Sequence, residues 1–177
     1  MNQRMWGAAL ATVLVLVSCG GRQSSSTGES AAGNAAEAEV VGQLLAISEV
    51  EVSTADIAES LLTTPDVTTL AERINMDHIS VRYSVKGLPS EDSDAARALI
   101  AARDSFAVVF RATPPASGDR VFLEHELQMH ARYIPMLDAM ATKAEKEDVK
   151  TIVQRLREVE DLHVTAIERV LKDLPAK

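Results

Sequence analysis

The stretch that decides the fold is RVFLEHELQMHARYIPMLDAMATKAEKEDVKTIVQRLREVEDLHVTAIERVLKDL, residues 120–174. Its apolar residues recur every three or four positions on both sides of a charged turn at 143–147. This is the periodicity of two amphipathic helices. His130 and His163 fall within the apolar stripes. We therefore predict a helical hairpin that carries one inward-facing histidine on each helix.

Residues 40–85 repeat this plan. A first helix, predicted to end near Leu62, carries Glu51 on its apolar face. The sequence TTPD at 63–66 then indicates a turn and a helix start, because proline suits the first helical positions and acidic residues suit the positive N-terminal end. The second helix carries His78 on its apolar face. The chain thus contains a second predicted hairpin with two inward-facing ionisable groups.

A long connection, residues 88–118, joins the two hairpins. Within it, SED at 90–92 predicts the start of one more helix, and TPPASG at 113–118 predicts a break. No strand-like alternation follows residue 40. We predict an all-α domain over 40–175, a four-helix bundle of two antiparallel hairpins joined by a long crossover with a short extra helix.

The N-terminal segment resembles a bacterial lipoprotein signal. Arg4 supplies a positive charge, residues 6–17 an apolar run, and LVSC at 16–19 a cleavage site with a small residue before cysteine. The resemblance implies that residues 1–18 are removed and that Cys19 becomes the lipidated N-terminus, so that the lipid anchors the protein to a membrane. The alternative is a secretory signal without lipidation, in which Cys19 is incidental.

The same resemblance implies a protein of the cell envelope, at the outer membrane and facing the periplasm in bacteria that have two membranes. The segment 19–39 is rich in glycine, serine and other small or polar residues. A segment of this composition buries little apolar surface. We expect a disordered tether between the lipid and the helical domain.

Charge and composition exclude several classes of function. The chain carries a formal net charge of −8, and nucleic-acid binding rests largely on Lys and Arg that neutralise phosphates. We therefore expect no nucleic-acid partner. Cys19 is the only cysteine, which leaves no thiol pair for a disulfide or a zinc–thiolate site. Aromatic residues are 3% of the chain, too few for a base-stacking surface.

Ionisable groups on the apolar stripes are the candidate functional residues. Glu51, His78, His130 and His163 point inward, one from each predicted helix, while Glu126 and Glu160 lie at the stripe edges. We take the first four as candidate metal ligands, and the two edge carboxylates as alternate ligands or as groups that orient the ligands. Glu49 and His125 fall on polar faces and are predicted to be solvated.

The two residues of each pair are level across their hairpin, because the midpoint of each pair falls in the predicted turn. At about 1.5 Å per residue, Glu51 and His78 lie roughly 20 Å from their turn, and His130 and His163 roughly 25 Å from theirs. The pairs meet at one height if the two turns share an end. They also meet if the turns lie at opposite ends of a bundle roughly 45 Å long.

Short motifs in both hairpins resemble the family called domain of unknown function 4142, over about Val40 to Leu174. The matching residues are Glu51, Thr64-Pro65-Asp66-Val67, Leu70-Ala71, Met76-Asp77-His78, Leu88-Pro89, Phe122, His130, Asp148-Val149 and His163. The resemblance implies a ferritin-like fold and an outer-membrane location. Metal-oxidising ferritin relatives use Glu-x-x-His on two helices. Glu160 and His163 match that spacing, whereas Asn75 places an amide three residues before His78.

Three functions remain open. The first is a binding or interaction module without catalysis, because the chain has no nucleophile–base set, phosphate loop or cofactor motif. In this interpretation the buried His and Glu form a metal-free polar network. The second is a metal-binding or metal-buffering protein, whose ligands suit Zn, Cu, Ni or Fe(II) rather than Ca or Mg. The third is a ferroxidase-like enzyme, which Asn75 argues against.

Overall fold

The structure, a computed structural model, describes residues 26–175 of the chain and the side chains of 33–175. This part is all helical, as predicted, and contains no strand. Among the described helices, none is both long and apolar enough to cross a membrane. The elements are α1 (Ser26–Ala58), a short 3-10 turn (Glu59–Leu61), α2 (Pro65–Val85), α3 (Asp94–Arg111), α4 (Pro115–Lys143) and α5 (Glu147–Asp173).

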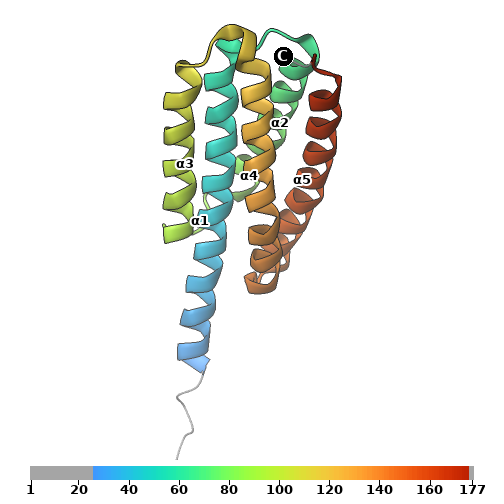
Figure 1. The fold of residues 1–177 in the computed structure, drawn as a ribbon. Helices are drawn as coiled ribbons and strands as arrows, with labels where there is room; N and C mark the ends of the chain where they lie inside the picture. Colours follow the sequence, from blue (N-terminus) through green and yellow to red (C-terminus); the bar gives the residue numbers. More distant parts are fainter. Residues whose placement is uncertain (1–25, 176–177) are drawn as a thin grey trace, which may run out of the picture.

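The five helices pack side by side as a bundle, and each runs antiparallel to the next in the chain (Figure 1). α1 packs against α2 and α4 packs against α5, so both predicted hairpins are present. Their turns lie at opposite ends of the bundle. α3 is the extra helix of the crossover and lies along α1, with further contact to α4. The second of the two predicted geometries, with opposed turns, therefore brings the polar pairs to one height.

α1 begins much earlier than the sequence analysis predicted. It is helical from Ser26, so residues 26–39 of the predicted tether belong to a helix, while 1–25 lie outside the described residues. Alanine and glutamate are frequent in this stretch, and both favour helix. Glu37 also accepts hydrogen bonds from the backbone N–H groups of Glu145 and Lys146, at 2.9 and 3.3 Å. Contacts with the α4–α5 turn thus stabilise the part of α1 that precedes residue 40.

α4 also begins earlier than predicted, at Pro115 inside the predicted break. A proline in the first turn does not destabilise a helix, because an N–H group at that position would have no hydrogen-bond partner within the helix. Asp119 then fastens this end to the α1–α2 turn. Its carboxylate accepts the backbone N–H and hydroxyl groups of both Thr63 and Thr64, at 2.6 to 3.1 Å. The break is therefore only the turn between α3 and α4.

Two apolar clusters fill the bundle. One surrounds Leu44 and Leu137 toward the α4–α5 turn, and the other surrounds Phe110 and Phe122 toward the α1–α2 turn. A layer of buried polar side chains separates them. Its members come from four helices: Glu51 and Thr54 of α1, His78 of α2, Glu126 and His130 of α4, and Glu160 and His163 of α5. The candidate site is this layer.

Candidate metal centre

The ionisable groups of the polar layer are almost completely shielded from solvent. Glu51, His78, Glu126, His130, Glu160 and His163 are each at most 3% exposed. Burial of an ionisable group without a partner costs several kcal/mol. The arrangement of their nitrogen and oxygen atoms must therefore provide partners within the layer or a place for a bound ion.

His130 is held by its own helix. Its Nδ1 lies 2.7 Å from the backbone carbonyl oxygen of Glu126, one turn earlier in α4. A carbonyl oxygen only accepts hydrogen bonds, so Nδ1 carries the proton and donates it. The other ring nitrogen, Nε2, then carries a lone pair that is directed toward the interior of the bundle.

His163 is held from outside the layer. Its Nε2 lies 3.1 Å from Oδ2 of Asp77 on α2, and Arg73 Nε contacts the same oxygen at 3.1 Å. Burial would raise the pKa of Asp77, but the hydrogen bonds from His163 and Arg73 lower it below its usual value. Asp77 is therefore an ionised acceptor, and Nε2 of His163 donates to it. The lone pair of His163 lies on Nδ1, which faces inward.

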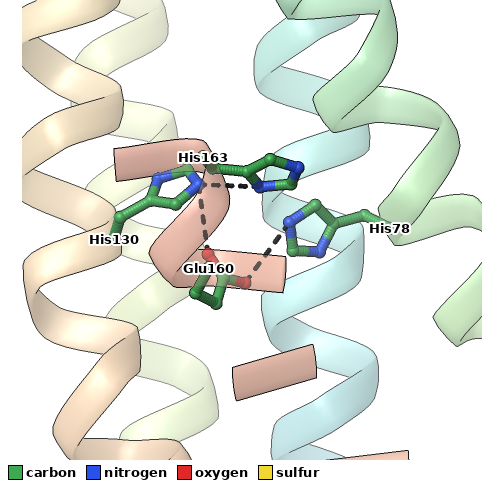
Figure 2. Close-up of side chains that lie close together, drawn as sticks. All are labelled: His78, His130, Glu160 and His163. Carbon is green, nitrogen blue, oxygen red and sulfur yellow. Dashed lines mark hydrogen bonds and ion pairs between the residues drawn. The ribbon is translucent and has the colours of Figure 1, made fainter. Parts of the chain in front are cut away.

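The inward nitrogens of these two rings meet. His130 Nε2 and His163 Nδ1 are 3.2 Å apart, and Glu160 Oε2 lies 3.1 Å from His130 Nε2. His78 adds an Nε2 at 3.5 Å from Glu160 Oε1. Figure 2 shows the three rings and the carboxylate arranged around one common space. Since the outer nitrogens of His130 and His163 hold their protons elsewhere, the inward nitrogens of both rings face this space as acceptors.

The protonation states suit a cation in that space. Burial lowers the pKa of His78 to about 3. Burial and then the neighbouring His130 lower the pKa of His163. Burial and then the charge of Glu51 raise the pKa of Glu160 well above its usual value. His78 and His163 are thus neutral, which is the form that ligates metal, and Glu160 holds a proton that a bound cation would displace.

The distances match those of a small metal site. His78, His130, Glu160 and His163 each place one ligand atom so that all four lie within 4.8 Å of one another. In a tetrahedral site with bonds of about 2.0 Å, neighbouring ligand atoms are about 3.3 Å apart. The separations of 3.1 and 3.2 Å around His130 Nε2 are close to that spacing. This cluster can hold a metal ion.

A second group shares His130. Glu51, Glu126 and His130 also place ligand atoms within 4.8 Å of one another. On this side the ring offers Nδ1, 3.8 Å from Glu126 Oε2, but that nitrogen already donates its proton to a carbonyl. Metal ligation needs a lone pair instead. The second group therefore lacks its nitrogen ligand.

The carboxylates of the second group differ in charge. Burial and then the charge of Glu51 raise the pKa of Glu126 well above its usual value. Burial would raise the pKa of Glu51 too, but the neighbouring His130 ring and hydrogen-bonding groups lower it. Burial and then Glu51 also raise the pKa of Tyr133, which stays a neutral phenol beside this pair. The group is best described as two carboxyl groups that keep one proton.

The structure brings together most of the residues that the sequence indicated. His78, His130 and His163 meet in one cluster. Glu160, assigned as an alternate, is the carboxylate beside them, whereas Glu51 lies with Glu126 in the neighbouring group. Cys19 lies outside the described residues.

Sequence reasoning missed the role of Asp77. The sequence feature that could have indicated this role is the position of Asp77 directly before His78. Neighbouring residues of a helix point in different directions, so the Asp77 side chain lies beside α5 while His78 points into the core. The prediction that His125 is solvated was wrong. Its ring is partly buried and stacks on Phe106 of α3, with centroids 3.6 Å apart and planes 8° apart. Helical periodicity within α4 does not reveal that α3 covers that face.

Comparison with known proteins agrees with the resemblance stated from the motifs. The profile of the family described as Domain of unknown function (DUF4142) matches residues 22–170. No curated protein and no solved structure matches the chain. The match covers nearly all of the described helices, including the four that build the polar layer. The chain therefore belongs to the DUF4142 family.

Proposed function

We propose that this protein binds one transition-metal ion inside its helical bundle, through His78, His130, Glu160 and His163. The observation that carries the proposal is the meeting of His130 Nε2 and His163 Nδ1 at 3.2 Å. Each ring donates its other N–H outward, to a carbonyl and to the Asp77 carboxylate. Metal-binding histidines are oriented in this way, with the distal N–H donated to an oxygen acceptor.

The donor set favours a particular class of metal. Three imidazoles and one carboxylate suit Zn, Cu, Ni or Fe(II), whereas Ca and Mg prefer shells of oxygen atoms. A set of four ligands favours Zn among these, because structural zinc sites are four-coordinate and closed. All four ligands are buried, which leaves little room for a substrate on the ion. We therefore propose metal binding or buffering rather than catalysis.

Ferroxidase chemistry has less support. A two-metal centre would need a second complete ligand group, and the group around Glu51 lacks a nitrogen ligand. Asn75 stands three residues before His78, and its side-chain nitrogen lies 3.3 Å from Asp56 on α1, away from the cluster. We infer a single ion rather than a pair.

The fold and the location belong to the same proposal. We propose that the bundle is ferritin-like, and its two hairpins, single long crossover and inward-facing His and Glu residues support this. We also propose that Cys19 is lipidated and anchors the protein in the cell envelope, which rests on the lipoprotein-like sequence of residues 1–19.

The test measures metal in protein purified without a histidine tag and then measures zinc affinity against a competing chelator. We expect about one zinc per chain, and a loss of affinity of roughly ten-fold or more in His130→Ala and in His163→Ala. His125→Phe is the matched control, because it removes an imidazole and keeps an aromatic ring against Phe106. Equal zinc affinity in all three variants and the wild type would refute the proposal.

A further inference from the structure

The seam between α2 and α5 is open on both sides of the candidate site. One hollow of about 580 Å³ lies toward the C-terminus of α5, and its walls include Thr69 and Arg73 of α2 and His163 and Ala166 of α5. A second, of about 140 Å³, lies further along the seam and includes Asp77, Ser80 and other residues of both helices. The same pair of helices therefore borders two hollows.

Two polar side-chain contacts join α2 and α5 near the candidate site, the fully buried His78–Glu160 pair and, nearer the surface, the contact between Asp77 and His163. The hydrogen bond from His163 Nε2 to Asp77 Oδ2 is the only side-chain hydrogen bond between α2 and α5 in the described part of the chain. The Asp77 side chain is 30% exposed, and its partner Arg73 is 67% exposed. Asp77 is thus a carboxylate that reaches both solvent and a candidate ligand.

The larger hollow reaches one of the candidate ligands. His163 lines it and is also a member of the buried cluster. The smaller hollow contains no member of that cluster, and Leu156 and Val159 form part of its wall. Thr69 of α2 and Ala166 of α5 are short side chains in the walls of the larger hollow.

We infer that the metal ion reaches its site along the α2–α5 seam through the larger hollow, and that the hydrogen bond between Asp77 and His163 closes the inner end of this path. This inference rests on the proposed metal site. Movement of the His163 ring away from Asp77 opens the route between solvent and the cluster. Asp77 therefore limits exchange of the ion and also positions His163.

The experiment measures both directions of exchange by stopped flow with the full chain. Zinc is mixed with the metal-free protein to follow loading, and the zinc-loaded protein is mixed with excess chromogenic chelator to follow release. Ala166→Trp fills the larger hollow. We expect both rates to fall by at least about ten-fold, which corresponds to about 1.4 kcal/mol of added barrier. The dissociation constant should stay nearly unchanged, because the ligands are intact.

Two further variants define the route. Ser80→Trp places the same side chain in the smaller hollow, and its rates should equal those of the wild type. Asp77→Ala removes the closing contact, and both loading and release should become faster. If Asp77 only positioned His163, release alone would become faster and loading would not change.

The inference is overturned if Ala166→Trp binds zinc and exchanges it at the wild-type rate, or if Ser80→Trp slows exchange to the same extent. Should Ala166→Trp fail to fold, Thr69→Trp fills the hollow from the facing wall and is judged by the same criteria. A wild-type protein that takes up no zinc refutes the proposed function itself, so the two failures are distinguishable.

Discussion

The rings of His130 and His163 face each other nitrogen to nitrogen at 3.2 Å, although they come from different helices of one hairpin. Two lone pairs at this distance repel unless a proton or a cation lies between them. The outer N–H groups are held by oxygen acceptors, which fixes the rings in this orientation. A cation bound between the two nitrogens would therefore relieve this repulsion.

Glu160 and Glu51 should differ in their effect on metal binding. Glu160→Gln removes the carboxylate that lies beside His78 and His130, so zinc affinity should fall by roughly ten-fold or more. Glu51→Gln changes a carboxylate of the other group and should have a smaller effect. Competition with a chelator measures both. A larger loss in Glu51→Gln would place the ion between Glu51 and Glu126 instead.

Acid should destabilise the metal-free protein through His78. Burial lowers the folded-state pKa of His78 to about 3, whereas the unfolded-state value is about 6.5. Between these values the unfolded state binds the extra proton, so the free energy of unfolding falls as the pH decreases. Relative to His78→Leu, the wild type should lose up to about 3 kcal/mol between pH 7 and pH 4.

Urea unfolding of both proteins with a chelator present measures this difference. Glu160 acts in the opposite sense, because its raised pKa gives stability below the unfolded-state value that is lost as the pH rises. Both proteins contain Glu160, so its contribution largely cancels in the comparison. Parallel stability curves for the wild type and His78→Leu would show that His78 is not held neutral by burial.

Asp119 should contribute strongly to stability without affecting the metal. Its carboxylate accepts four hydrogen bonds from Thr63 and Thr64 and joins the start of α4 to the α1–α2 turn. Asp119→Ala leaves those donors without their partner and should cost about 2 kcal/mol. Asp104→Ala, at an exposed position of α3, should cost less than about 0.5 kcal/mol. Equal unfolding midpoints for the two variants would contradict this role.

The lipid anchor is tested by labelling cells with a palmitate analogue. The wild type should be labelled and should fractionate with membranes, because an acyl chain transfers favourably into the bilayer. Cys19→Ala should be unlabelled, since it removes the only cysteine of the chain. Cys19→Ala protein that is still acylated at the membrane would exclude lipidation at this residue.

Helical periodicity predicted the buried layer well, because a residue's direction relative to its own helix axis depends only on sequence spacing. It placed Glu51, His78, His130 and His163 inside, and all four are buried. It did not decide which carboxylate joins the histidines. That choice depends on the rotation and height of α1 relative to α5, and these are set by packing between helices.

Two other differences between the prediction and the structure also result from packing between helices. His125 is covered because α3 lies across that side of α4, and nothing in the periodicity of α4 indicates a neighbour from the crossover. The early start of α1 depends on Glu37 meeting the α4–α5 turn, which is 108 residues away in the chain. Contacts between distant segments decide both features, and a single sequence contains little information about them.

The ligand cluster takes its side chains from α2, α4 and α5 and none from α1. α1 is also the helix that follows directly from the N-terminal segment of the chain. Mechanical tension applied through that segment would load α1 first, whereas the candidate ligands all lie on other helices. The fold thus separates the helix that would bear such a load from the three helices that contain the candidate ligands.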